Sequence, residues 1–199
     1  SYVLGLHGPC VAYDTACSAA LTACHAGLRA LQLNECSVGL TAGVNLMLGP
    51  GVGASFAVAG MTSVRGRCHT FDARADGYVR GEACVGASMQ CSPGSEPRCM
   101  LGSAVRQDGR SASLTAPSGQ AQQGLLRAAL ADAIIDPSEV VLSEAHGTGT
   151  SLGDPIEAGS FSGVVLLGRD VGSAVVGLGS GKANLGHAEP AAGLTGLLK

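Results

Sequence analysis

The sequence predicts an α/β fold, in which short buried strands alternate with amphipathic helices. Apolar runs of strand length are followed, several times along the chain, by stretches with helical spacing. Hydrophobic residues make up 46% of the 199 residues and charged residues only 14%, which is typical of a deeply buried core. The 31 glycines supply tight turns between elements. Alternation of this kind predicts parallel sheets covered by helices.

The first part of the chain is expected to contain one long helix and three strands. The helix spans about residues 18–33, because Leu21, Cys24, Leu28 and Leu31 are spaced for one buried face. Residues 65–81 are polar and rich in turn-forming residues, which favours a loop. The strands are expected at residues 11–13, 38–44 and 83–91.

A break is predicted at residues 92–97, because the segment SPGSEP contains two prolines and a glycine. We therefore expect one half over residues 1–91, a linker over 92–99 and a second half over 100–199. Strands in the second half are expected at residues 100–105, 140–145 and 174–178, and helices at 121–134, 155–166 and 191–198.

Composition excludes several classes of protein. The net charge of -3 leaves no basic footprint for nucleic acid. Residues 36–64 carry no charge, but their six glycines, Asn45 and Pro50 favour a buried strand, turns and a short apolar helix over a membrane span. The eight cysteines contain no CxxC pair and lie mostly in apolar runs. This pattern predicts free thiols in a reducing, cytoplasmic or organellar compartment, with neither disulfides nor a metal site.

Three residues with catalytic chemistry follow predicted strands. Cys17 is expected at the start of the long helix, where free backbone N–H groups and the helix dipole favour a thiolate. His146 and His187 each follow a strand in the second half. In open α/β sheets, ligands bind at the carboxyl ends of the strands. A single cysteine or histidine in such a place is more often structural. Three such residues, each directly after a predicted strand, indicate a reactive site.

The motifs around these residues resemble those of the ketosynthases, the condensing enzymes of polyketide and fatty-acid assembly. The matching blocks occur in the family's order across nearly the whole chain. The glutamate at position 144 is similar to that of the multidomain polyketide and fatty-acid enzymes, because discrete bacterial ketosynthases tend to have Asn at this position. The first block is DTACS at residues 14–18, and the second consists of FD at 71–72, ADGY at 75–78 and GE at 81–82. The third is EAHGTGT at 144–150 with GDPIE at 153–157, and the fourth is KANLGHAEPAAG at 182–193. Ala83 departs from the family's usual glycine.

The resemblance implies a thiolase-like αβαβα layered fold of two similar halves, here incomplete at both ends, and a homodimer. It also implies a decarboxylative Claisen condensation. Cys17 would accept an acyl group, and His146 and His187 would stabilise the enolate formed from a malonyl-type extender. Lys182 would support them, while Thr148 and Thr150 would bind the pantetheine arm. The implied partners are an acyl-carrier protein and its phosphopantetheine-bound acyl and malonyl thioesters, with no cofactor bound by the domain. Arg65, Arg67 and Arg74 are candidates for the carrier's docking surface.

Two alternatives stay open. A thiolase shares the fold and the nucleophile but has a different second block and a second reactive cysteine. A non-catalytic ketosynthase-like partner typically lacks the cysteine or one histidine, and this chain has all three. A nucleotide-binding P-loop at residues 177–182 is excluded, because Ala183 replaces the Ser or Thr that holds magnesium and Val176 replaces the first glycine.

Overall fold

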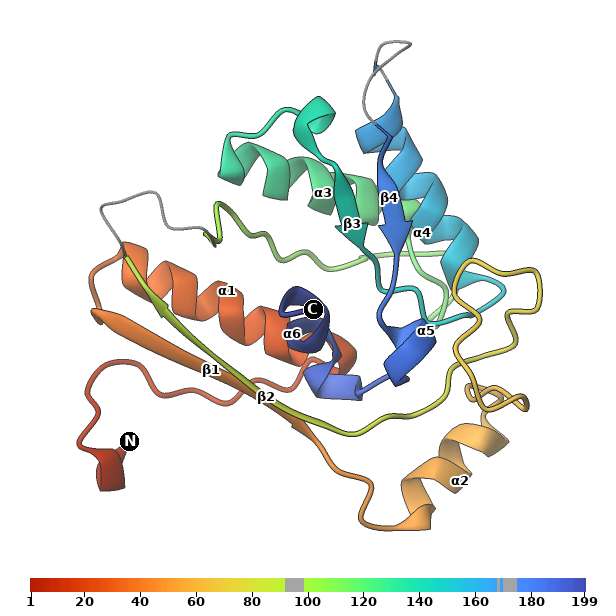
Figure 1. Cartoon of the computed structure of the whole chain (residues 1–199), viewed down its shortest axis with the longest axis horizontal. Helices are drawn as coiled ribbons and strands as arrows, with labels where there is room; N and C mark the ends of the chain where they lie inside the picture. Colours follow the sequence, from red (N-terminus) through yellow and green to blue (C-terminus); the bar gives the residue numbers. More distant parts are fainter. Residues whose placement is uncertain (92–98, 168, 170–174) are drawn as a thin grey trace. The chain divides into compact units, whose positions relative to one another are not determined.

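The computed structural model describes residues 1–91, 99–167, 169 and 175–199 (Figure 1). These residues form two compact units, each assembled from segments distant in sequence. The first unit comprises Ser1–Leu46, Glu82–Cys99 and Ala188–Lys199, and the second comprises Met47–Gly81 and Met100–His187. Residues 92–98 of the expected linker lie outside the described residues, so the division into halves at this linker stays a prediction.

The first unit is built on an antiparallel pair of strands covered by helices. Strand β1 (Val38–Asn45) pairs with β2 (Ala83–Gln90), from Val38 opposite Gln90 to Asn45 opposite Ala83. Helices α1 (Ala19–Gln32) and α6 (Ala192–Leu197) pack against this pair (Figure 1). The short 3₁₀ turns of this unit are η1 (Tyr2–Leu4), η2 (Ala16–Ser18) and η5 (Glu189–Ala191).

Small residues allow the helices of this unit to approach the strands closely. A Cβ atom at Gly43 on β1 would lie 3.0 Å from Ala20 Cβ and 3.1 Å from Ala191 Cα. Ala20, Cys24 and Leu31 are buried on α1, whereas Leu21 is 43% exposed. Cys24 and Leu31 therefore lie on the buried face that the spacing predicts, whereas at its start Ala20 is buried in place of Leu21.

The second unit contains a parallel pair, β3 (Leu142–Glu144) and β4 (Gly177–Gly179). Its buried cluster joins α3 (Gly119–Ala133) and α4 (Gly153–Phe161) to these strands, since Leu126 on α3 and Leu178 on β4 pack against Phe161 and its neighbours. The other elements are α2 (Pro50–Val58), η3 (Pro137–Glu139), the π-helical turn η4 (Ser162–Leu166) and α5 (Lys182–Leu185).

Local chemistry explains where the helices begin and end. The Ser118 hydroxyl accepts a hydrogen bond from Ala121 N (3.2 Å), which satisfies a free donor in the first turn of α3. Helix α3 ends where Ile134 adopts a left-handed conformation (φ 56°). Asp154 and Pro155 occupy the first turn of α4, where a carboxylate complements the helix dipole and proline costs no hydrogen bond.

Most predicted elements are confirmed, but two strands and one sheet direction are wrong. Residues 11–13 and 100–105 form no strand, and Val11 and Leu101 are 64% and 59% exposed. Among the described residues, neither segment has a neighbouring strand to complete its hydrogen bonds. The β1–β2 pair is antiparallel, whereas a parallel sheet was expected. This prediction was wrong because an apolar strand carries no signal for the direction of its partner. None of the helices in the described part of the chain is both long and apolar enough to span a membrane.

Candidate active site

His146 lies in a loop that a carboxylate holds by its backbone. The loop leaves β3 after Glu144, and Glu157 on α4 accepts hydrogen bonds from His146 N (2.6 Å) and Gly147 N (2.8 Å). Charge-assisted bonds of this kind are shorter and stronger than neutral ones. Glu157 therefore sets the path of the backbone from which the His146 ring projects.

Glycine is required in this loop for two reasons. Gly147 and Gly149 both have positive φ angles, 49° and 79°. A Cβ atom at Gly147 would lie 2.7 Å from Ser180 Cβ, and one at Gly149 would lie 2.6 Å from His69 N. Other residues would be strained by the backbone conformation and would collide with these neighbours. The repeated glycines of the GTGT run thus let the loop pack tightly against two other segments.

The backbone of His187 is bound to residues 79–81. His187 N donates to Val79 O (2.7 Å), and Gly81 N donates to His187 O (2.8 Å), which forms a parallel bridge. The residue is buried, with 4% of its surface exposed, and its ring meets that of Tyr78 edge to face at 5.0 Å between centroids. His187 is therefore held by both its backbone and its ring.

The rings of His146 and His187 lie edge to face within the second unit. Their centroids are 5.5 Å apart and their planes are nearly perpendicular, at 89°. Burial, followed by the positive charge of Lys182, lowers the pKa of His146 to about 4, although part of the residue is exposed. Burial, then His146 and Lys182, lowers the pKa of His187 to about 3. Both rings are therefore neutral near pH 7, and each carries one N–H donor.

Lys182 is the cation of this cluster. It is the first residue of α5 and is 8% exposed. Its charge opposes protonation of both histidines, as their lowered pKa values show. The structure thus brings together three of the predicted site residues, namely His146, Lys182 and His187.

Cys17 belongs to the first unit, in the turn that leads into α1. Ala16 has a positive φ angle of 53°, which is uncommon for a residue with a side chain. The Ser18 hydroxyl donates to Thr15 O (2.9 Å), and Ala16 N donates to Asp14 Oδ1 (3.3 Å). The turn therefore bends sharply at Ala16 and leaves Cys17 partly exposed, immediately before the helix. This is the helix N-terminal position predicted for the nucleophile.

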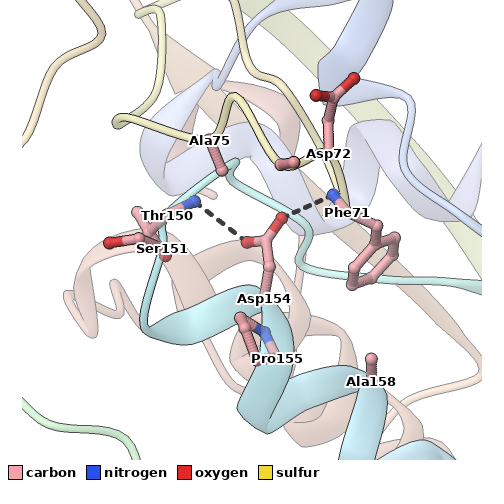
Figure 2. A pocket seen from close by; sticks show the side chains of 9 residues that line it. Phe71, Asp72, Ala75, Thr150, Ser151, Asp154, Pro155 and Ala158 are labelled. Carbon is pink, nitrogen blue, oxygen red and sulfur yellow. Dashed lines mark hydrogen bonds between the residues drawn. The ribbon is translucent and has the colours of Figure 1, made fainter.

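Thr150 lines a pocket of about 380 Å³ in the second unit (Figure 2). Figure 2 shows Asp154 between two loops, where its carboxylate accepts from Phe71 N (2.8 Å) and Thr150 N (3.1 Å). Thr148 is 6% exposed and does not line this pocket. The lining residues are Phe71, Asp72, Ala73, Ala75, Thr150, Ser151, Asp154, Pro155 and Ala158. The two threonines, predicted to act alike, therefore have different surroundings.

Sequence reasoning did not assign roles to three acidic residues of the second unit. Asp154 and Glu157 stood out only as parts of a motif, and Glu144 only as a mark of the enzyme type. Each carboxylate accepts from backbone N–H groups of loops beside the histidines. The available signal was an acidic residue in the first turn of a helix and another one turn later, directly after a glycine-rich loop.

Taken one unit at a time, the described residues hold no group of three His, Cys, Asp or Glu side chains close enough to share a metal ion.

Comparison with known proteins assigns nearly the whole chain to one family. The model described as "Beta-ketoacyl synthase, N-terminal domain" matches residues 1–90, and "Beta-ketoacyl synthase, C-terminal domain" matches residues 99–199. The chain is 46% identical to one component of the phenolphthiocerol/phthiocerol polyketide synthase of Mycobacterium tuberculosis and 45% identical to another component of that synthase. These alignments cover 100% of this chain but only 11% and 9% of the relatives.

Solved structures agree in fold. A ketosynthase from module 6 of the bacillaene synthase of Bacillus subtilis 168 matches 99% of this chain with a TM-score of 0.92 and 37% identity. An oxazolomycin ketosynthase domain from Streptomyces albus JA3453 matches 98% with a TM-score of 0.91 and 35% identity. The chain spans 37% and 36% of these two proteins. The predicted α/β, thiolase-like fold is confirmed, and the chain belongs to the beta-ketoacyl synthase family.

Proposed function

We propose that this chain carries the reactive groups of a ketosynthase, an acyltransferase that performs decarboxylative Claisen condensation in polyketide or fatty-acid assembly. The observation that carries this proposal is the pair of neutral histidines, whose rings lie 5.5 Å apart beside Lys182. Neutral imidazoles donate hydrogen bonds without giving up a proton, which suits stabilisation of a developing enolate oxygen.

The first step loads the nucleophile. Cys17 Sγ attacks the carbonyl carbon of an acyl thioester held on the phosphopantetheine of an acyl-carrier protein. A new sulfur–carbon bond forms, the pantetheine sulfur leaves, and it takes the proton that the Cys17 thiol releases. The partial exposure of Cys17, in the turn that leads into α1, supports this role.

The second step generates the carbon nucleophile. A malonyl thioester loses carbon dioxide when the bond between its α-carbon and its carboxylate breaks. The electron pair moves into an enolate, whose oxygen accepts hydrogen bonds from His146 and His187. The α-carbon then attacks the Cys17 thioester, the Cys17 sulfur leaves as thiolate, and a 3-oxoacyl thioester is released on the carrier.

Lys182 and the two threonines have supporting roles in this proposal. The charge of Lys182 helps to keep the histidines neutral, since it lowers the pKa of both. The Thr150 hydroxyl oxygen accepts from Gly153 N (3.2 Å), which leaves its proton available to a ligand amide. The pocket beside Thr150 is lined by apolar groups, two hydroxyl groups and the carboxylates of Asp72 and Asp154. Arg74 pairs with Asp72, and backbone N–H groups bind Asp154. The apolar and hydroxyl groups support binding of a neutral pantetheine arm. Thr148 remains a proposed contact on the strength of the family motif alone.

The proposed partner is an acyl-carrier protein, and the proposed assembly is a homodimer. Arg65 and Arg74 both have exposed side chains, but each is already engaged. Arg65 donates to Arg74 O (2.7 Å), and Arg74 forms a bidentate ion pair with Asp72 (2.9 and 2.7 Å). Arg65→Glu should raise the KM for a carrier-bound substrate but not for a small thioester mimic, with Arg127→Glu on α3 as the control. Equal effects on both substrates would remove Arg65 from the docking surface.

The test of the proposed function is formation of a 3-oxoacyl product from an acyl thioester and a malonyl thioester by the full-length polypeptide. We expect the wild-type polypeptide to form this product and the Cys17→Ala variant to form none. A thiolase would instead make its product from two acyl thioesters without release of carbon dioxide. A non-catalytic partner would show neither acyl transfer to Cys17 nor decarboxylation.

A further inference from the structure

Glu144 connects the two segments that carry the histidines. It is the last residue of β3, two positions before His146, and it lies opposite Gly179 in the parallel register with β4. Its carboxylate extends past the end of the strand, where Oε1 accepts a hydrogen bond from Gly181 N at 2.6 Å. Both Gly181 and the neighbouring Lys182 are buried. A backbone N–H in such a place needs a partner, because leaving it unpaired is costly.

Gly181 controls where the second histidine segment begins. It precedes Lys182, the first residue of α5, and α5 leads through Gly186 to His187. The far end of this segment is bound by the bridge from His187 to residues 79–81. At the near end, the bond to Glu144 is supplemented by Ser180, whose hydroxyl donates to His146 O at 3.4 Å. The position of Lys182 relative to His146 therefore depends strongly on Glu144.

We propose that Glu144 is a positioning residue for decarboxylation, which holds the turn at Gly181 so that Lys182 and His187 meet His146 in the correct geometry. This inference rests on the proposed function. It assigns Glu144 no contact with the substrate. Its carboxylate accepts a hydrogen bond from the backbone at Gly181, so the proposed role depends on an acceptor oxygen at the reach of Glu144.

The chain offers a set of matched variants. Glu144→Ala removes the acceptor, Glu144→Asp withdraws it by one methylene group, and Glu144→Gln keeps an acceptor oxygen at the same reach. Glu139→Ala is the control, because Glu139 also accepts a backbone N–H, from Asp136 at 2.8 Å, but it lies before β3 at the end opposite to Glu144.

The experiment measures two half-reactions in the full-length polypeptide: carbon dioxide release from a malonyl thioester and acyl loading of Cys17. Glu144→Ala and Glu144→Asp should lower kcat for decarboxylation by about tenfold or more, with KM and loading within about twofold of wild type. Glu144→Gln and Glu139→Ala should stay within about threefold in both assays. If Glu144→Ala does not fold, Glu144→Asp carries the test.

Several results would overturn the inference. One is unchanged decarboxylation in Glu144→Asp, and another is an equal loss of loading, which would indicate a general structural role. A third is Glu144→Gln as impaired as Glu144→Ala, which would make the charge the active feature. His187→Ala in the same assays separates the two proposals. If His187→Ala loses decarboxylation while Glu144→Asp does not, only the role of Glu144 fails; if His187→Ala keeps it, the proposed function fails.

Discussion

The imidazole rings of His146 and His187 lie edge to face, with 5.5 Å between their centroids. The first residue lies in the glycine-rich loop after β3, and the second follows α5, 41 positions later in the numbering. Each ring has a lowered pKa, partly because Lys182 places a positive charge near both. This arrangement places two neutral imidazole rings side by side, each with one N–H group.

Cys17 and His187 should separate the two half-reactions. Cys17→Ala should abolish acyl loading but retain release of carbon dioxide, because both enolate donors remain. His187→Ala should retain most loading and lower decarboxylation by about 10²–10³-fold, as expected for loss of one oxyanion donor. Acyl-enzyme mass and carbon dioxide release, measured on both variants, decide the question. Equal loss of both reactions in both variants would contradict this division of roles.

The pH profile of decarboxylation should reflect the histidines. Their pKa values of about 4 and 3 lie below the ordinary value of 6.5, so both rings are neutral above about pH 5. Protonation of the histidines should therefore not lower the rate between pH 6 and 8. The rate should fall only as the pH approaches the two histidine pKa values. Lys182→Met removes a charge that lowers both pKa values, so the acid limb should move to higher pH. An acid limb that stays in place would exclude Lys182 from this role.

Cys17 should be the first of the eight cysteines to react with iodoacetamide. Cys24 and Cys68 are 2% and 1% exposed, and burial raises the pKa of each thiol, which disfavours the reactive thiolate. The exposed cysteines, such as Cys84 on β2, lie outside the DTACS run at residues 14–18 that resembles the nucleophile motif of the ketosynthases. Peptide mass spectrometry after limited alkylation of the full-length polypeptide provides the measurement. Labelling of Cys24 or Cys84 before Cys17 would refute the assignment of the nucleophile.

Gly149→Ala should destabilise the fold by about 1–3 kcal/mol, because it combines an unfavourable φ of 79° with a Cβ position 2.6 Å from His69 N. Gly159→Ala is the matched control. Gly159 lies within α4 with open space around it. Alanine at this position should therefore leave the free energy of unfolding unchanged or raise it by about 0.4–1 kcal/mol. Urea denaturation of both variants measures the difference in free energy of unfolding. Equal stabilities would show that the loop accommodates a methyl group.

Local sequence patterns were sufficient to predict most of the helices and strands, although α5 was not expected. The helix after Cys17 was expected at about residues 18–33 and extends over Ala19–Gln32. Its amphipathic spacing and the preceding turn are properties of neighbouring residues, so they can be read along the chain. The same holds for β1 and β2, whose residues are apolar and bounded by turns. The family motifs likewise identified Cys17, His146 and His187 by their immediate neighbours, although the catalytic roles remain proposals.

What only the tertiary structure decided depends on contacts between distant residues. The antiparallel pairing of β1 with β2 joins strands separated by an entire segment of the other unit, and nothing in either strand encodes the direction of its partner. The bond from Glu144 to Gly181 spans 37 positions, and the bond from Phe71 to Asp154 spans 83. The lowered pKa values of the histidines likewise depend on burial and on Lys182. Sequence determined which groups are present, whereas folding determined their distances, and electrostatic and hydrogen-bond energies depend on those distances.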